Sequence, residues 1–588
     1  MMRTSNCGEL NTKSIDRQVT LAGWVDTRRD HGNLIFIDLR DRWGVTQVVF
    51  NTELSPELLK IAEQIRPEFV LQVIGKVRRR PAGTANPKLV TGEIEVAAEQ
   101  VEILNGCPTP PFEIGDRDVG EEIRLKYRFL DLRRKDMVES LTVRHRVSKL
   151  VRDHLDRLGF LEIETPYLTR STPEGARDFL VPSRLTPGSF YALPQSPQLF
   201  KQLLMVAGYD RYYQLARCFR DEDLRSDRQP EHTQIDMEMS FVEENDVMAV
   251  VEGLVAELAE KVLDQKLSKP FPRMSYQEAM DRYGTDKPDL RFAMELRDLS
   301  AIFSASGFKV FDQVLAGGGK VRGICFRPPR GAELSRKNFD DLVLWIKDFG
   351  AHGLAWLKVV DGGKAESPIS KFFSPEKIAE VFKSFEATAG DIIFLVASSA
   401  AVSAKALGAL RLHLAQTYKL IPEEEMRVLW VVDFPLLEWN EEEKRWDAMH
   451  HPFTAPRPED IPLLDSDPGK VRARAYDLVL NGTEIGGGSI RNHRQEVQQK
   501  LFQALNIGEE EAKNKFGFLL MALTYGAPPH GGLAIGLDRL VTMFLKRPSI
   551  REVIAFPKTQ KGTCLMTEAP SEVGAGQLKE LQISIKKN

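Results

Sequence analysis

The sequence predicts a multidomain α+β protein in which a small N-terminal β-barrel precedes a larger antiparallel-sheet domain that carries an inserted α/β domain. The first hundred residues alternate short apolar stretches with turn signals, as the strands of a small barrel do. Further along, glycine-rich turns and alternating helix and strand patterns indicate a separate α/β stretch at residues 292–421. With 588 residues, 42% of them hydrophobic, the chain is long enough to bury several cores.

The barrel is expected at residues 1–106. A helix is predicted at residues 56–64, because Ser55 is placed to cap it and Pro56 takes the first helical position. One helix among five short strands is typical of a Greek-key barrel of the OB type. The five strands are expected at residues 19–25, 34–39, 45–50, 69–77 and 92–104.

The rest of the chain divides where its composition changes. A proline-rich stretch after Cys107 indicates a hinge, and the pattern from Ser140 onward is that of a long amphipathic helix. An apolar strand at residues 428–439 resumes the main domain after the insertion, and the polar end of the chain is expected to be a loosely held tail. The predicted segments are the hinge at 107–139, the first part of the main domain at 140–291, the insertion at 292–421, the second part of the main domain at 422–557 and the tail at 558–588.

Composition and charge argue against several classes of protein. The 84 acidic residues nearly balance 80 lysines and arginines, so the net charge of −4 does not suit a protein that coats nucleic acid nonspecifically, although a local basic face is compatible with it. The five cysteines include no CxxC pair, which argues against a zinc site or a disulfide framework. Neither an apolar leader nor a long uncharged apolar run is present, so a cytoplasmic protein without a membrane segment is expected.

A charged hairpin is expected at residues 219–241. Two strand-like ends flank a loop dense in arginine, aspartate and glutamate, and a solvated charge run is the ordinary interpretation of such a loop. Arg220 also suits a chemical role, because its planar guanidinium can bind two oxygens at once without losing its charge. An enzyme that brings a carboxylate to an α-phosphate needs such a group.

Two other stretches favour the chemical role. Residues 532–545 have the pattern of a strand that contains two glycines and leads into a helix near Arg539. Residues 159–168 have the pattern of a helix end followed by a strand that stops at Pro166. In their order along the chain, these stretches and the hairpin resemble the three signature motifs of class II aminoacyl-tRNA synthetases. The resemblance implies a homodimer formed through the first motif, an Arg220 that binds carboxylate and phosphate, and an Arg539 that grips the γ-phosphate of ATP.

Four further stretches narrow the resemblance to the bacterial-type aspartate enzymes of this class. The insertion is also similar to the one typical of that family, so the likeness covers essentially the whole chain. It implies an OB-fold anticodon-binding domain, a class II synthetase antiparallel-sheet catalytic domain and an inserted α/β domain. It further implies that ATP activates L-aspartate to aspartyl-adenylate and pyrophosphate, and that aspartate then passes to the 3′ end of tRNA(Asp). The four stretches are residues 171–184, 192–205, 449–454 and 481–491.

The same resemblance implies an aspartate pocket. Lys201 and Arg491 are expected to face the side-chain carboxylate, and neutral asparagine would leave these two cations uncompensated. His450 lies in the stretch similar to the substrate-sensing loop, with His451 as a second candidate. The other expected residues are Glu174, Gln198 and Asp236 around the ammonium group, Ser196 nearby, and Arg220.

An ATP site with Mg²⁺ is implied as well. Asp477 and Glu484 flank a turn, and a hairpin there can aim both carboxylates at one hard cation, which the family pattern makes a Mg²⁺ that bridges ATP phosphates. The three glycines at residues 486–488 let the backbone approach the nucleotide closely. His232 departs from the family pattern, in which a phenylalanine stacks on adenine, and an imidazole stacks with less area. The expected ATP-binding residues are Arg220, Asp221, Glu222, Gln229, His232, Glu484, Gly536, Leu537, Asp538 and Arg539.

In the barrel, Arg29, Phe36 and Gln47 resemble the anticodon-reading set of the family. An exposed Phe36 would stack a base while Arg29 and Gln47 read base edges, although a core position for such a phenylalanine is the commoner arrangement. His31 and Gly83 stand where strictly tRNA(Asp)-specific relatives tend to carry leucine and a bulkier residue such as lysine. These two residues predict an enzyme that also accepts tRNA(Asn), with a tRNA(Asp)-only enzyme as the alternative.

Two other functions fit parts of the pattern. An asparaginyl enzyme of the same class is disfavoured by the pair Lys201 and Arg491 and by the bacterial-type insertion. A non-catalytic RNA-binding relative should have lost Arg220, Glu484 or Arg539, and all three are present. The pattern as a whole therefore favours the aspartate enzyme.

Overall fold

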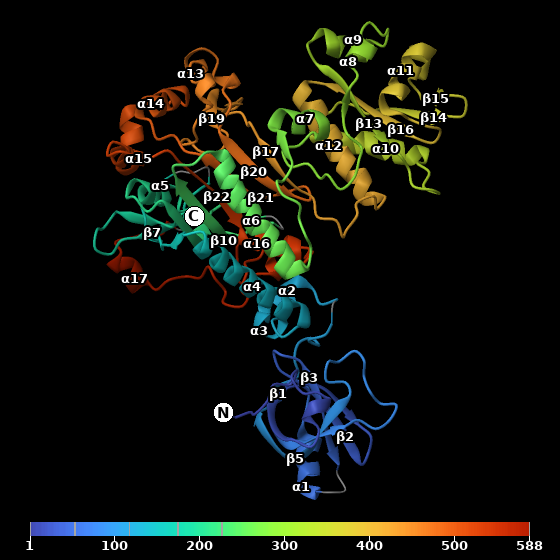
Figure 1. Ribbon diagram of the computed structural model, residues 1–588, viewed down its shortest axis with the longest axis vertical. Helices are drawn as coiled ribbons and strands as arrows, with labels where there is room; N and C mark the ends of the chain where they lie inside the picture. The colour runs from blue at the N-terminus through green and yellow to red at the C-terminus, as the bar shows by residue number, and fades with distance from the viewer. Residues whose placement is uncertain (1, 52–54, 117, 173–175, 225–226, 587–588) are drawn as a thin grey trace. The chain divides into compact units, whose positions relative to one another are not determined.

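The computed structural model describes residues 2–51, 55–116, 118–172, 176–224 and 227–586. The chain packs as two units (Figure 1). The first unit comprises Met1–Thr142, Ala555–Thr559 and Thr563–Ala569, and the second comprises the remainder. Among the described residues, no helix is both long and apolar enough to cross a membrane.

The first unit is built on a closed barrel with the strand order β1-β2-β3-β5-β4, which confirms the predicted OB-type fold. On β2, Ile35, Ile37 and Leu39 fill the interior, and the residues between them lie on the outer face. The predicted helix has the expected bounds, and the Ser55 hydroxyl caps it by accepting a hydrogen bond from the backbone N–H of Leu58. The elements are β1 (Gln18–Asp30), β2 (Leu34–Arg40), β3 (Val45–Asn51), α1 (Pro56–Gln64), β4 (Val70–Arg79) and β5 (Ile94–Asn105).

The segment predicted as a hinge contains two short helices, α2 (Glu121–Lys126) and α3 (Arg128–Asp131). Asp131 is fully buried, pairs with Arg128 and accepts a hydrogen bond from Nε of Arg124 at 2.7 Å. Nε of Arg128 also donates to the carbonyl of Ala555 at 2.8 Å. This contact attaches a C-terminal stretch of the chain to the first unit.

The second unit contains an eight-stranded sheet that brings the predicted motifs together. Its order is β11-β17-β20-β21-β22-β10-β9-β6, so the charged hairpin formed by β9 and β10 adjoins the glycine-spaced strand β22. The edge strands β6 and β11 pair in parallel with their neighbours, and the inner pairs are antiparallel. The strands are β6 (Leu161–Glu162), β9 (Arg211–Phe219), β10 (Glu231–Ser240), β11 (Arg273–Ser275), β17 (Val428–Val432), β20 (Ala475–Leu480), β21 (Thr483–Ile490) and β22 (His530–Gly536).

Helices α4 (Lys135–Arg157), α6 (Glu244–Leu263) and α16 (Leu537–Phe544) pack on this sheet around one hydrophobic core (Figure 1). Asp538, at the start of α16, ties the charged hairpin to α4, the helix that precedes the first predicted motif. One of its carboxylate oxygens pairs with Arg144 on α4, and the other accepts a hydrogen bond from the backbone N–H of Thr233 on β10 at 2.8 Å. The nearly buried ion pair of Arg144 and Asp538 therefore holds α4, β10 and α16 together.

Two predicted strands are shorter than expected. The stretch at 428–439 is broken into β17 and β18 (Leu437–Asn440), because Asp433 adopts a φ of 56° and Pro435 has no N–H to donate. Within residues 159–168, all of which the structure describes, Leu161–Glu162 alone pair as a strand, and both side chains are exposed. The long helix, by contrast, begins at Lys135 and not at Ser140.

The insertion folds around a five-stranded sheet with the order β12-β13-β16-β14-β15 and has a hydrophobic core on each face. The apolar stretch at residues 392–398 forms β16, which lies at the centre of this sheet. The elements are β12 (Arg297–Asp298), α8 (Ser300–Phe303), α9 (Lys309–Ala316), β13 (Lys320–Phe326), α10 (Arg336–Trp345), β14 (Ala355–Val360), β15 (Lys364–Glu366), α11 (Pro375–Phe385), β16 (Ile392–Ser398) and α12 (Ala400–Thr417).

Smaller elements connect these sheets and complete the chain. The predicted tail includes one short helix, α17. The connecting elements are β7 (Leu180–Pro182), β8 (Phe190–Ala192), α5 (Gln198–Val206), α7 (Tyr276–Tyr283), β19 (Arg445–Ala448), α13 (Leu463–Ser466), α14 (Gln495–Ala504), α15 (Glu509–Leu523) and α17 (Ala575–Glu580).

Candidate active site

A cavity of about 600 Å³ is lined by residues of β10, β20, β21 and β22. Most residues singled out in the sequence meet there, although they come from distant parts of the chain. Asp221 is not among the lining residues and faces Arg177 at 3.7 Å, while the side chain of Leu537 lies in the hydrophobic core. Glu174 lies outside the described residues. The predicted residues that line the cavity are Ser196, Gln198, Lys201, Arg220, Glu222, Gln229, His232, Asp236, His450, Asp477, Glu484, Arg491, Gly536, Asp538 and Arg539.

Four charged side chains are buried against one another beside this cavity. Nζ of Lys201 lies 2.9 Å from Oδ2 of Asp236 and 3.2 Å from Oε2 of Glu238. Arg491 donates to the two oxygens of Glu238 at 2.9 and 3.1 Å. Burial raises the pKa of Asp236 to about 6 despite the neighbouring Lys201. Burial would also raise the pKa of Glu238, but Arg491 and Lys201 outweigh it and lower that pKa to about 2.

From the sequence, Lys201 was expected to face only the carboxylate of a ligand. The structure gives it two partners within the protein, Asp236 and Glu238. Glu238 is the residue that sequence reasoning missed. The sequence does contain a sign of this residue, because Asp236 and Glu238 are two acids on the same face of a strand whose apolar residues are buried. A Cβ at the neighbouring Gly532 would lie 2.1 Å from Oε2 of Glu238, so this acid fits only beside glycine.

Several buried polar atoms around the cavity have no hydrogen-bond partner within the described chain. They are Nε2 of Gln198, Nε of Arg220, Oδ1 of Asp236 and Nε2 of His451. Burial, with the positive charges of Arg491 and Lys201, lowers the pKa of His451 to about 3, so its ring is neutral. Buried polar groups are normally satisfied, so two donors, one acceptor and a neutral imidazole indicate a polar ligand with both acceptor and donor groups.

Two further arginines, Arg228 and Arg539, line the cavity and add positive charge to it. Nη1 of Arg539 donates to the carbonyl of Glu484 at 2.7 Å, and its Nη2 lies 3.6 Å from a carboxylate oxygen of Asp227. Arg228 pairs with Glu222 at 3.0 Å on the hairpin tip. Asp538 lines the cavity, but its carboxylate is engaged by Arg144 and Thr233, which makes it a support for the neighbouring Arg539.

Asp477 and Glu484 form a close carboxylate pair on β20 and β21. A Cβ at Gly487 would lie 2.5 Å from Oδ1 of Asp477 and 3.8 Å from Oε1 of Glu484, so glycine leaves the space between them open. Burial, followed by the charge of Asp477, raises the pKa of Glu484. Among the described residues, no cluster of three or more histidine, cysteine, aspartate or glutamate side chains is placed to hold a metal ion. The pair therefore fits a cation that takes its other ligands from a bound molecule or water.

The pKa values of two histidines of the cavity, His450 and His232, are shifted in opposite directions. Nε2 of His450 lies 3.7 Å from Oδ1 of Asp477, and although burial disfavours the charged ring, this carboxylate raises the pKa of His450 overall. The ring of Phe434 packs edge-on against His450 at 4.7 Å between centroids. Burial, and then Arg220, lower the pKa of His232 to about 4, so His232 offers a neutral ring.

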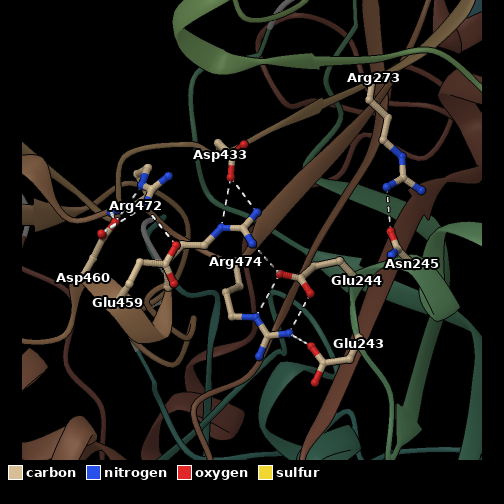
Figure 2. Close-up of polar contacts among 10 residues, drawn as sticks. Glu243, Glu244, Asn245, Arg273, Asp433, Glu459, Asp460, Arg472 and Arg474 are labelled. Carbon is tan, nitrogen blue, oxygen red and sulfur yellow. Dashed lines mark hydrogen bonds and ion pairs between the residues drawn. The ribbon is translucent and has the colours of Figure 1, made fainter.

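An ion-pair network outside the cavity holds the base of the loop that carries His450 (Figure 2). Arg457, just after this loop, donates to Oδ1 of Asp433 at 2.6 Å and lies 3.7 Å from Glu244. Arg474 in turn donates to Oε2 of Glu244 at 2.6 Å. Asp433 directly precedes the phenylalanine that packs on His450, so the network fixes two sides of this loop against the start of α6.

In the barrel, the three predicted tRNA-reading residues share the outer face. Arg29 pairs across the strands with Phe36, and Nη2 of Arg29 lies 3.0 Å from Oδ1 of Asp38 and 3.3 Å from Oε1 of Gln47. Phe36 is half-buried on the outside of β2, so it is not part of the barrel core. Gln47 is buried more deeply and also donates to Glu95 at 2.8 Å.

His31 and Gly83 occupy two loops of the barrel. The ring of His31 contacts the edge of Phe36 at 5.5 Å between centroids. Gly83 has a φ of 82°, in a turn closed by a hydrogen bond from the N–H of Thr84 to the carbonyl of Pro81. A Cβ at Gly83 would meet no atom within 4 Å, but the backbone itself requires glycine.

The family of the chain is shown by its sequence. Residues 120–560 match the family described as tRNA synthetases class II (D, K and N), and residues 19–104 match the OB-fold nucleic acid binding domain. The chain therefore belongs to the class II tRNA synthetases. It is 55% identical to the aspartate–tRNA(Asp/Asn) ligase of Natranaerobius thermophilus over the whole of both chains. The enzyme of the same name from Aquifex aeolicus is 54% identical, with 99% of this chain and 98% of that one covered. Within its class, the chain is thus a member of the aspartate–tRNA ligase family.

Solved structures agree on the fold. The asparaginyl-tRNA synthetase of Pyrococcus horikoshii complexed with asparaginyl-adenylate superposes with a TM-score of 0.60 over 95% of this chain and 99% of that one. Its sequence identity to this chain is 19%, so this likeness concerns the architecture alone.

We expect Lys201→Leu to destabilise the protein as well as the site. The substitution leaves Asp236 and Glu238 as buried carboxylates with less compensation, and the expected loss is about 3–5 kcal/mol in the free energy of unfolding. Chemical denaturation measures this loss. Adding Asp236→Asn removes one of the two charges and should restore part of the stability. An unchanged denaturation midpoint in Lys201→Leu would contradict the buried-pair description.

Proposed function

We propose that this enzyme activates L-aspartate with ATP to aspartyl-adenylate and pyrophosphate, and transfers aspartate to the 3′ end of tRNA(Asp) and of tRNA(Asn) in the cytoplasm. The observation that carries the choice of amino acid is the buried group of Lys201, Asp236, Glu238 and Arg491. The atoms without partners in Gln198, Arg220 and Asp236 suit a ligand that has carboxylates and an ammonium group.

Charge balance explains the preference for aspartate over asparagine. Lys201, Arg491 and the ligand ammonium provide three positive charges, and Asp236, Glu238 and the side-chain carboxylate provide three negative ones. Asparagine lacks the last of these, so one buried positive charge would stay uncompensated, which is costly away from water. This preference depends on Glu238, because without this acid the two protein cations would repel each other.

Activation requires positioning and electrostatic stabilisation. An α-carboxylate oxygen of aspartate attacks the α-phosphorus of ATP, and the bond to the pyrophosphate oxygen breaks on the opposite side. Arg220 holds carboxylate and α-phosphate together, and Arg539 binds the departing pyrophosphate. The terminal ribose hydroxyl of tRNA then attacks the carbonyl carbon of the adenylate, and AMP leaves. No protein side chain needs to form a covalent bond in this sequence.

Asp477 and Glu484 are the residues that would hold Mg²⁺. Their proximity and burial fit a divalent cation, since a positive charge would relieve the repulsion that raises the pKa of Glu484. When bound, the ion would neutralise charge on the phosphates of ATP. His232 would stack on adenine as a neutral ring, in the place where the family pattern has phenylalanine.

We also propose that two copies form a homodimer through α4 and the residues after it. Large apolar side chains are exposed there, among them Leu161, Tyr167 and Leu168, each about half exposed. A cluster of this kind on one face suits a self-complementary two-fold contact.

The outer face of the barrel is the proposed anticodon contact. Phe36 offers a ring for base stacking, with Arg29 and Gln47 beside it. His31 packs on Phe36 and has donor and acceptor nitrogens, so it can accommodate either of the two bases that distinguish the anticodons. Gly83 leaves room in the second loop.

Arg220→Ala and Arg539→Ala should each lower aspartate-dependent ATP–pyrophosphate exchange by at least about a hundredfold, because each removes a fixed charge from the phosphates. Circular dichroism should show an intact fold. Arg445→Ala, on the half-exposed hairpin of β18 and β19, is the matched control and should keep normal exchange. Near-normal exchange in either active-site variant would overturn the assignment.

Light scattering at micromolar concentration should give twice the mass of 66.4 kDa. Tyr167→Glu together with Leu168→Glu should shift the protein toward the monomer, because buried carboxylates in an apolar contact are unfavourable. A monomeric mass for the unaltered protein would refute the dimer.

Charging of purified tRNA(Asp) and tRNA(Asn) should proceed with kcat/KM values within about tenfold, or 1.4 kcal/mol. His31→Leu should reduce charging of tRNA(Asn) and leave tRNA(Asp) nearly unaffected. Gly83→Lys is a poor test, since it would strain the turn that Gly83 closes. A thousandfold preference of the unaltered enzyme for tRNA(Asp) would establish the tRNA(Asp)-only alternative.

A further inference from the structure

The insertion contacts residues 284–291 of the catalytic domain. We name this stretch the Asp286 segment. Asp286 lines the cavity, and Nζ of Lys287 lies 3.8 Å from its carboxylate. The side chain of Asp286 is 36% exposed, and that of Lys287 is 47% exposed. Neither residue was singled out from the sequence.

The inner side of this segment supports the carboxylate pair of the site. A Cβ at Gly482 would lie 2.9 Å from Cβ of Asp289, so Asp289 is packed directly against the turn between β20 and β21. That turn joins the strand that carries Asp477 to the strand that carries Glu484.

The outer side of the segment is held by the insertion helix α12. A Cβ at Gly284 would lie 2.0 Å from the carbonyl oxygen of Ala404, and one at Gly408 would lie 2.6 Å from the carbonyl oxygen of Tyr283. The two backbones therefore touch, and glycine is required on each side of the contact.

Arg411 of α12 completes the attachment. Its Nη2 donates to the carbonyls of Asp289 and Phe292, each at 2.8 Å, and its Nε donates to the carbonyl of Met294 at 3.1 Å. The guanidinium also lies 3.9 Å from the ring centre of Phe292 and 4.9 Å from that of Tyr283. Arg411 is 2% exposed, so a single buried cation holds one carbonyl of the segment, that of Asp289, and two carbonyls just after it.

We infer that the insertion, through Arg411, positions the phosphate and cation end of the active site, with Asp286 as an additional residue facing bound MgATP. Arg411 is a positioning residue, because it touches the Asp286 segment and not the cavity. The ligand class is a polyphosphate with its divalent cation, because the Asp286 carboxylate lines the cavity and can contact the cation. The inference rests on the proposed function.

The test is ATP–pyrophosphate exchange by the full-length protein. Arg411→Met should raise the KM for MgATP about tenfold and leave the KM for aspartate within about twofold, because a displaced segment disturbs one end of the site. Arg411→Lys should recover part of the loss, since an ammonium group can still donate to the carbonyls.

Arg322→Met is the matched control. Arg322 is also a buried arginine of the insertion; it donates to the carbonyl of Ala400 at 3.0 Å and pairs with Asp281 on α7. Its removal should lower the melting temperature without changing the ratio of the two KM values. Equal changes in both KM values for Arg411→Met, or the same selective change for Arg322→Met, would overturn the inference.

Asp286→Asn tests the inference without disturbing the attachment. It should raise the KM for MgATP several-fold and increase the Mg²⁺ concentration needed for half-maximal exchange, with the KM for aspartate unchanged. An unchanged KM for MgATP in Asp286→Asn, or in Arg411→Met that is shown to be folded, would contradict this inference and leave the proposed function standing. Absence of aspartate-dependent exchange in the unaltered enzyme would instead contradict the proposed function.

Discussion

The buried group of Lys201, Asp236, Glu238 and Arg491 is the constraint on which the catalytic domain depends. Ions in a site of low polarity are tolerated only when paired and hydrogen-bonded, and here each cation has a carboxylate within about 3 Å. The pairing determines the neighbouring sequence, because Gly532 must lack a side chain for Glu238 to fit. It also bears on the choice of substrate, since the group is already neutral and a ligand preserves that balance only when its own charges there cancel.

The large sheet presents two chemically different regions in one cavity. The group around Lys201 suits an amino acid, whereas the pair Asp477 and Glu484, with Arg539 nearby, suits phosphates and a cation. Two structures outside the cavity support the second region. The ion-pair network fixes the loop of His450, whose Nε2 lies 3.7 Å from Asp477, and the insertion adjoins the turn between β20 and β21 through the Asp286 segment. A change remote from the cavity can therefore affect one substrate and spare the other.

Sequence reasoning succeeded where local pattern and motif order carry the information. Alternating apolar residues indicated the barrel strands, and Ser55 with Pro56 gave the bounds of α1. It was less accurate where tertiary contacts decide. The strand expected at 428–439 is interrupted at Asp433, and the side chain of Leu537 turns into the core and away from the cavity. Glu238 was missed because two acids on one face of a strand, Asp236 and Glu238, give no sign of the cations that they pair with.

The sequence by itself determined the OB-type barrel, the class II catalytic domain, the position of the insertion and most residues of the cavity, because these depend on periodicity and on motifs whose order survives in the linear chain. Only the tertiary structure decided which charges pair, that Asp538 supports the site through Arg144, and that Arg411 ties the insertion to the Asp286 segment. Such pairings join residues from 35 to 394 positions apart, and their energies depend on burial and distance, which no local pattern records.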